Sequence, residues 1–238
     1  KPYALTKEEE DIMERLERAF ENCEKLQRHM HFLLNKGGLY KVYNGNLLYH
    51  GCVPLKEDGN LKSVRIFGRA YKGKGLYEVL ESYVRKGFYA MDPKEKERGK
   101  DIMWYIWLSE NSPLFGKDKM ATFERYFLAE KETHKEKKNP YYLLLEDEKV
   151  VEKILKEFGL ENEDAHIING HVPVKCKDGE NPVKCGGKVL VIDGGFSKAY
   201  QKETGIAGYT LIYNSYGLIL AAHKPFESTE AAIEKESD

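Results

Sequence analysis

The sequence of 238 residues has no apolar run that approaches the roughly 20 residues needed to cross a bilayer. Its first residues, KPYALTKEEEDIMERL, also lack the apolar core of a secretion signal. These two absences predict a soluble cytoplasmic protein that has no membrane partner.

An excess of either charge is missing as well. The chain carries 38 basic and 39 acidic side chains, for a net charge of −1. Proteins that bind DNA or RNA usually present a basic surface, so a nucleic acid partner is not expected. Hydrophobic residues make up 41% of the chain, which is enough for the core of one large domain or of a domain with an insert.

Cysteine is scarce, and none of the four cysteines forms a C-x-x-C pair. Cys176 and Cys185 flank the segment KDGENPVK, which has the composition of a hairpin. A disulfide or a metal knuckle at this hairpin is the less favoured interpretation. In a large chain of cytoplasmic character, free thiols are the expectation.

The spacing of apolar residues predicts the order of helices and strands. Residues 7–35 have the pattern of one amphipathic helix, and Asn44-Gly45 indicates a hairpin between strands at 39–42 and 47–49. We expect a strand within 61–72, a charged connection at 92–100 and a loop at 111–119. Further helices are expected at 75–85, 101–108, 121–130 and 148–158, and further strands at 166–168, 188–192, 210–214 and 218–223. This order predicts an α/β layer protein with a mostly helical insert at about 73–160.

Two histidines each follow a short apolar strand and precede a turn that contains proline. His50 ends NLLYH before GCVP, and His171 ends HIINGH before VP. Side chains at the carboxyl ends of strands project into the crevice where open α/β sheets bind ligands. Neutral imidazole is a common metal ligand, so His50 and His171 are candidates to share a metal centre. The alternative is that each is an ordinary hydrogen-bonded histidine in a turn.

A third strand, KVLVI, leads into Asp193 and two glycines. Glycines let the backbone approach a ligand closely, and consecutive N–H groups can hold an anion, so Asp193 is a candidate substrate-binding residue. The alternative is a simple glycine turn. Basic residues in the loops of the expected insert suit phosphate groups, although most such residues lie on solvated faces. The candidates are Lys117, Lys119, Arg125, Lys135 and Lys138.

Several stretches of the chain resemble the bacterial class III fructose-1,6-bisphosphatases. They are NGNLLYHGCVP, TFERYF, THKEKKNPYY, HIINGHVPVK and VIDGGFSKAYQKETGIAGYTLIYNSYG, and the resemblance runs from about residue 10 to 235. It implies the fold of the calcineurin-like metallophosphoesterases, a β-sandwich flanked by helices with a dinuclear metal site at its strand ends. It also implies removal of the 1-phosphate of fructose 1,6-bisphosphate to give fructose 6-phosphate, a step of gluconeogenesis, with manganese as the divalent metal.

The family's metal motifs match this chain only in part. His50 corresponds to the family's lone histidine, and Gly170-His171 corresponds to its late Gly-His, where Gly170 is expected to permit a tight turn. The other three motifs, Asp-x-His, Gly-Asp-x-x-Asp and Gly-Asn-His, are all expected to be missing from the 238 residues. The chain is therefore expected to be the later part of a catalytic domain that lacks the N-terminal metal motifs.

A segment of this kind is expected to bind metal poorly and to be inactive alone. Its exposed sheet edge makes association into a homo-oligomer an expectation too. Two other functions compete with the phosphatase. One is a non-catalytic sugar-phosphate-binding or regulatory module, and the other is a metallophosphatase that acts on another phosphoester.

Overall fold

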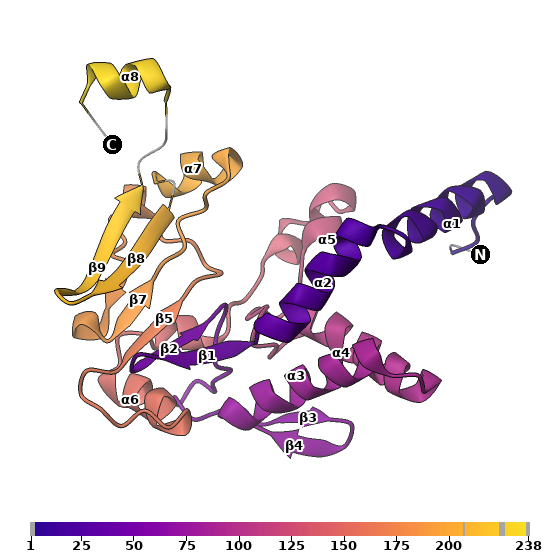
Figure 1. Ribbon diagram of the computed structural model, residues 1–238, viewed down its shortest axis with the longest axis horizontal. Coiled ribbons are helices and arrows are strands. Elements are labelled where there is room, and N and C mark those ends of the chain that lie inside the picture. The colour runs from indigo at the N-terminus through magenta and orange to yellow at the C-terminus, as the bar shows by residue number, and fades with distance from the viewer. Residues whose placement is uncertain (1–2, 207, 224–226, 237–238) are drawn as a thin grey trace. The chain divides into compact units, whose positions relative to one another are not determined.

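The computed structural model describes residues 3–206, 208–223 and 227–236 (Figure 1). The chain forms two compact units, residues 1–38 and residues 39–238. Within the described ranges, no helix is both long enough and apolar enough to span a membrane.

The first unit holds two helices, α1 (Lys7–Glu21) and α2 (Glu24–Lys36). The prediction of one helix over 7–35 was therefore wrong. The Asn22 side chain and its N–H both donate to the carbonyl of Arg18, which satisfies the end of α1, and Cys23 is extended. The apolar residues keep helical spacing across the break at Asn22 and Cys23, so a prediction based on that spacing does not detect the break.

The second unit contains all nine described strands and the remaining helices. Its strands are β1 (Tyr40–Tyr43), β2 (Asn46–Tyr49), β3 (Val64–Ile66), β4 (Arg69–Tyr71), β5 (His166–Asn169), β6 (Val183–Lys184), β7 (Val189–Val191), β8 (Gly208–Asn214) and β9 (Gly217–His223). Its α-helices are α3 (Gly73–Tyr89), α4 (Pro93–Leu108), α5 (Thr122–Phe127), α6 (Glu148–Glu157), α7 (Lys198–Thr204) and α8 (Thr229–Glu234). Short 3-10 helices lie at Lys131–His134, Pro140–Leu143, Cys176–Asp178 and Cys185–Gly187.

A five-stranded mixed sheet in the order β1-β2-β5-β7-β6 organises this unit. The central strands β2, β5 and β7 are parallel, and β1 and β6 are antiparallel additions at the two edges. Helix α6 and the 3-10 turn at Pro140–Leu143 contribute side chains to the same core as β2, β5 and β7. The architecture is thus α/β, as the order of elements predicted.

The hairpin between β1 and β2 is confirmed, with Asn44 and Gly45 both at positive φ. The strand expected within 61–72 is a second hairpin, β3–β4. Helices dominate the segment between β4 and β5, but two boundaries differ from the prediction. Residues 92–100 are not a connection, because Asp92 caps α4 and Pro93 occupies its first turn. Helix α5 is shorter than the predicted 121–130.

Candidate functional site

The carboxyl ends of β2 and β5 bring His50 and His171 together. The two strands are parallel neighbours that pair Asn46 with His166, so residues that follow them emerge at the same edge of the sheet. The Nε2 atom of His50 lies 2.9 Å from Nδ1 of His171. The backbone N–H of Gly170 also donates to the carbonyl of His50 at 3.0 Å. Two imidazoles 121 positions apart in the chain therefore share one local structure.

The tight turn at this edge is made by His171 itself. Its φ is +67°, in the left-handed region that side chains other than glycine rarely occupy. Gly170 has no such angle, and a Cβ atom added there would meet Asp193 at an ordinary contact distance of 3.4 Å. The expectation that Gly170 supplies the turn was wrong. Backbone strain at a residue with a candidate chemical role is typical of functional sites.

The second ring nitrogen of His171 fixes the proton arrangement. Nε2 lies 2.8 Å from the carbonyl oxygen of Phe115, which can only accept, so Nε2 carries the proton. In the neutral ring, Nδ1 then presents its lone pair toward His50. A ligand histidine normally donates its other N–H to a carbonyl or carboxylate, and Phe115 supplies such an acceptor.

The surroundings favour neutral imidazoles. Desolvation by neighbouring protein atoms lowers the pKa of both histidines, although His50 as a whole residue is exposed. The nearby carboxylate of Asp193 counteracts this effect on the pKa of both rings, and the proximity of His50 adds to the lowering at His171. Neutral imidazole is the form that coordinates a metal ion.

Asp193 lies beside the two histidines at the end of β7. Its Oδ1 accepts the N–H of Gly195 at 2.9 Å, so that N–H is already engaged within the turn. Gly194 serves packing, because an added Cβ atom would lie 2.6 Å from the Cα of Gly208. An acidic side chain against two imidazoles suits a cation better than it suits a phosphate.

The loop from Ser112 to Lys117 makes hydrogen bonds both to the segment that follows His50 and to the ring of His171. The N–H of Cys52 donates to the carbonyl of Pro113 at 2.9 Å, while the carbonyl of Phe115 accepts from His171. Gly51 packs so closely on Pro113 that an added Cβ atom would clash with its carbonyl oxygen. The buried side chain of Asn169 donates to the carbonyl of Gly51 from the other side, at 3.1 Å.

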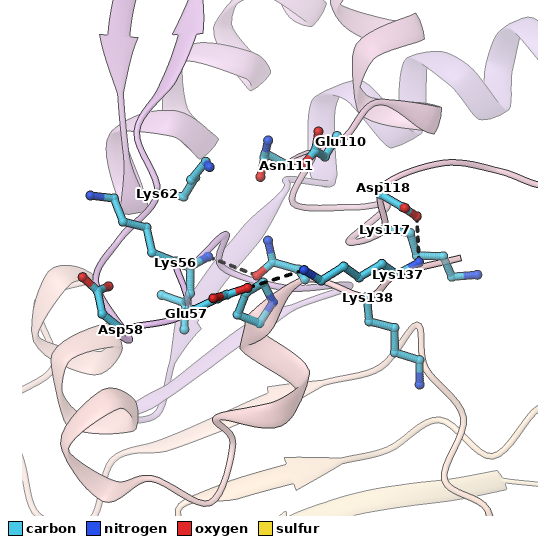
Figure 2. Close-up of a pocket in the computed structure, with 13 residues that line it drawn as sticks. Lys56, Glu57, Asp58, Lys62, Glu110, Asn111, Lys117, Asp118, Lys137 and Lys138 are labelled. Carbon is cyan, nitrogen blue, oxygen red and sulfur yellow. Dashed lines mark hydrogen bonds and ion pairs between the residues drawn. The ribbon is translucent and has the colours of Figure 1, made fainter. Parts of the chain in front are cut away.

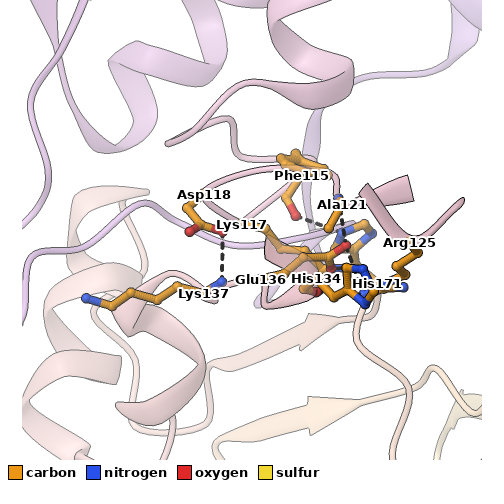
Figure 3. A network of polar contacts seen from close by, with 9 residues as sticks. All are labelled: Phe115, Lys117, Asp118, Ala121, Arg125, His134, Glu136, Lys137 and His171. Atoms are coloured by element: carbon orange, nitrogen blue, oxygen red, sulfur yellow. Dashed lines mark hydrogen bonds and ion pairs between the residues drawn. The ribbon is translucent and has the colours of Figure 1, made fainter. Parts of the chain in front are cut away.

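Two of the predicted cations meet on one carboxylate that the sequence analysis did not single out. Glu136 accepts from Lys117 at 2.8 Å and from Arg125 at 3.2 Å, and its Oε1 also accepts the N–H of Ala121 at 3.1 Å (Figure 3). Lys117 is near enough to His171 to lower the pKa of its ring. The lone acid in the basic run HKEKK was the available signal for Glu136.

The other predicted lysines are placed differently. The Nζ of Lys119 donates to the carbonyl of Thr133 at 2.7 Å, and Lys135 pairs with Glu132 on an exposed surface. Lys138 lies in a cluster of like charges. Desolvation lowers its pKa, Glu180 opposes that shift, and Lys175 and Lys117 lower the pKa further. Lys175 thus belongs with Lys117 and Lys138, although it was not a predicted site residue.

A cavity of about 430 Å³ is lined in part by Lys117 and Lys138, and neither His50 nor His171 lines it (Figure 2). Lys56 and Lys62 line one side of it, and the side chain of Lys138 extends away from them (Figure 2). The acids that line it are Glu57, Asp58, Glu110 and Asp118. Since five lysines and four acids line this cavity together, it does not have the one-signed charge of a phosphate pocket.

Two neutral imidazoles and the Asp193 carboxylate have donor chemistry that fits a divalent cation. Among the residues described, however, no group of three or more His, Cys, Asp or Glu side chains could hold a metal ion. The expectation that the chain contains no Asp-x-His was wrong, because Asp164-Ala165-His166 has this spacing. His166 starts β5, at the opposite end from His171, and its Nδ1 contacts Asn46 Oδ1.

The cysteines form no disulfide in the described part of the chain, as expected. Cys52 is fully buried, and its thiol has a pKa raised to about 12, chiefly by burial. The thiol of Cys176 lies 2.6 Å from the hydroxyl of Tyr209. The hydrogen bonds described for the ring nitrogens of His50 and His171 involve no thiol.

Comparison with known proteins relates the chain to one family. The sequence model of a family described as Firmicute fructose-1,6-bisphosphatase matches residues 1–238. The chain is 58% identical over its 238 residues to proteins named fructose-1,6-bisphosphatase class 3 from Clostridium botulinum strain Hall and Clostridioides difficile strain 630. A class 3 protein from Clostridium beijerinckii is 54% identical over 237 residues. The matches cover the whole chain but only 36% of each relative. No solved structure matches the chain.

Proposed function

The chain belongs to the Firmicute fructose-1,6-bisphosphatase family, and from this premise we propose that the complete polypeptide hydrolyses a phosphate ester of fructose 1,6-bisphosphate. The reaction proposed is release of the 1-phosphate to leave fructose 6-phosphate, as in gluconeogenesis. The observation that carries the proposal is the 2.9 Å approach of His50 Nε2 to His171 Nδ1, next to a group of basic side chains. This arrangement supplies metal donors and phosphate partners in one place.

His50 and His171 are proposed as metal ligands, and Asp193 as a carboxylate that balances the charge of the metal. The cofactor proposed is a divalent ion, with manganese as the first candidate, in the dinuclear site of a calcineurin-like metallophosphoesterase. When bound, such ions polarise a phosphoryl oxygen and activate water for attack on phosphorus. The remaining ligands would come from the part of the relatives that this chain does not cover.

The residues of this chain position the substrate. The Phe115 carbonyl holds the proton of His171 on Nε2, so Nδ1, which lies 2.9 Å from Nε2 of His50, carries the lone pair proposed to bind the metal. Lys117, Arg125 and Lys138 are proposed to bind the phosphate that is not cleaved. A sugar bisphosphate carries up to four negative charges, so its two phosphates need separate cationic partners. Lys119 and Lys135 are proposed as outer contacts, since they are not bound to Glu136 as Lys117 and Arg125 are.

The wider assignments are proposals of the same kind. We propose that residues 1–238 are part of a catalytic domain, that residues 73–160 are a helical insert, and that the enzyme works in the cytoplasm. Association into a homo-oligomer is also proposed, because the sheet has exposed edge strands.

The first experiment measures bound metal and phosphate release in the complete polypeptide. Wild type, His50→Ala and His171→Ala would be incubated with manganese, and bound metal would be counted by mass spectrometry after removal of free ions. We expect each histidine variant to lose metal and at least about 100-fold in phosphate release, because it removes a ligand. His29→Ala, at an exposed histidine in the first unit, is the matched control and should behave like wild type.

Three results would contradict the proposal. Histidine variants with full metal content would remove the metal role of the pair. Wild type that hydrolyses other phosphoesters but not the bisphosphate would favour a different metallophosphatase. Wild type that binds sugar phosphate without any turnover would favour a regulatory module. Residues 1–238 alone should release no phosphate, and robust turnover by them would show that the active site lies elsewhere.

A further inference from the structure

Glu136 is the meeting point of the predicted phosphate-binding cations. Its side chain is only 14% exposed, and it receives three donors: the ammonium of Lys117, the guanidinium of Arg125 and the N–H of Ala121. Most other carboxylate–cation pairs of the described residues are far more exposed, such as Lys137 with Glu57, at 74% and 83%. Exposed pairs of that kind contribute little, whereas a mostly buried carboxylate with three donors has a defined geometry.

The backbone around Glu136 is fixed by the same two segments that carry the cations. Residues 116–118 lie beside residues 137–139: Asp118 N–H donates to the carbonyl of Lys137, and Asn139 N–H donates to that of Gly116. The Lys137 N–H returns a bond to the Asp118 carboxylate at 2.7 Å (Figure 3). This paired structure follows Phe115, whose carbonyl binds His171. Glu136 is therefore held at a fixed position relative to the histidine pair.

The charge balance of this group points to an anion. One carboxylate and two cations leave a net charge of +1 next to His171. Lys138 interacts with Lys117, and near Lys138 the charges of Lys175 and Glu180 have opposite signs. Without Glu136, the two long side chains would repel each other and turn toward solvent. Ordering two long side chains costs conformational entropy, and Glu136 imposes that order before any substrate arrives.

We propose that Glu136 is a positioning residue, which holds Lys117 and Arg125 in place for the phosphate of the sugar bisphosphate that is not cleaved. This inference rests on the proposed function and assigns the substrate specificity of that site. Glu136 does not touch the reacting phosphate, and it acts through the two cations that it orders. Its loss should therefore weaken recognition of a second phosphate and leave the chemical step nearly unchanged.

The test compares a substrate that has two phosphates with one that has a single phosphate. In the complete polypeptide with manganese, Glu136→Gln should raise KM for fructose 1,6-bisphosphate by about tenfold and change kcat by less than about twofold. With phenyl phosphate, which has no second phosphate, both constants should stay within about twofold of wild type. Gln is nearly isosteric with Glu and can still accept the Ala121 N–H, so the fold should persist.

Two further variants sharpen the comparison. Glu136→Asp keeps the charge on a shorter arm and should recover part of the lost affinity. Glu57→Gln removes a carboxylate from an exposed lysine pair outside the group, with the same change in net charge, and should leave KM unchanged. A lower KM in Glu136→Gln would overturn the proposal, because it would mean that Glu136 opposes the substrate. Equal losses on both substrates, or a KM that Glu57→Gln raises as much, would also overturn it.

A binding measurement separates failure of this inference from failure of the proposed function. Isothermal titration of fructose 1,6-bisphosphate into the metal-free complete polypeptide should give a Kd about tenfold weaker for Glu136→Gln than for wild type. If wild type does not hydrolyse the bisphosphate but this difference in Kd is found, the proposed reaction fails and the role of Glu136 stands. If the two Kd values are equal, or wild type does not bind the bisphosphate, the role of Glu136 is refuted.

Discussion

His171 and Phe115 are 56 positions apart, yet the Nε2 proton of the histidine ring points at the Phe115 carbonyl across 2.8 Å. The rotation of the ring therefore depends on a loop as well as on the strand that precedes it. Gly116, the next residue of that loop, has φ +61°, and an added Cβ atom would lie 2.7 Å from the hydroxyl of Tyr142. The loop conformation requires a glycine at this position.

Gly116→Ala should destabilise the protein by about 2–4 kcal/mol, from left-handed strain and overpacking together. Because the carbonyl of Phe115 would move with the loop, the variant should also bind manganese more weakly. Gly45→Ala is the control, with φ +76° and nothing within 4 Å of the added Cβ atom. It should lose only about 1 kcal/mol and keep full metal binding. Urea unfolding and metal titration of both variants would check this, and equal losses would contradict it.

Tyr49, the residue directly before His50, shares a buried hydrogen bond of 2.7 Å with Tyr141 through the two hydroxyl groups. Tyr141→Phe should cost about 1–3 kcal/mol, because the Tyr49 hydroxyl is then buried without a partner. The double variant Tyr49→Phe/Tyr141→Phe should cost less than the sum of the single changes, since no orphan hydroxyl remains. A double-mutant cycle from urea unfolding measures the difference, and strict additivity would show that the bond has no coupling energy.

Asn139 joins the loop after His50 to the basic segment. Its Oδ1 accepts the N–H groups of Leu55 and Tyr141, at 3.1 and 3.0 Å, and the residue is buried. Asn139→Ala would leave both donors unpaired and should cost about 2–4 kcal/mol. Asn181 makes one similar bond to Val183 N–H on an exposed surface, so Asn181→Ala should cost below about 1 kcal/mol. Thermal unfolding of the two variants would separate these outcomes.

The dependence of the free energy of unfolding on pH should show the contribution of the ionised Glu136 carboxylate. Burial alone would raise the pKa of its carboxyl, but the hydrogen bonds from Lys117 and the Ala121 N–H outweigh it and hold the pKa below the usual 4.5. A group whose pKa is lowered on folding stabilises the folded state above its unfolded pKa and loses that contribution as pH falls. Wild type should therefore have a larger free energy of unfolding than Glu136→Gln at pH 7. The difference between the two free energies should shrink as the pH falls to 3. A difference independent of pH would contradict this expectation.

The sheet could be predicted because its signals are local. Asn44-Gly45 determines a hairpin wherever it stands between two apolar runs, and the Ile and Val content of β5 and β7 matches strands buried on both faces. The convergence of His50 and His171 was predicted from their positions after two short apolar strands, and the parallel pairing of these strands in the structure accounts for it. The left-handed turn at His171 did not, since a φ of +67° is rare for histidine and tertiary contacts impose it.

Other features were missed because the sequence gives competing local signals. The charges of residues 92–100 resemble a connection, but Asp92 followed by Pro93 is also a helix start, and α4 begins there. Glu136 lies in a basic run in which any acid could be a solvated neighbour. Its role depends on Lys117 and Arg125, respectively 19 and 11 positions away, and no pattern in one sequence specifies that pairing.

The parallel pairing of β2 with β5 joins residues 120 positions apart, as the contact of Asn46 with His166 shows. Closing so long a loop costs entropy before any contact is gained, and contacts of this range slow folding. Helices α3, α4 and α6, built from local contacts, are expected to form earlier. The two imidazoles would then meet only near the end of folding, so that a newly made chain acquires the arrangement proposed to bind metal as one of its last steps.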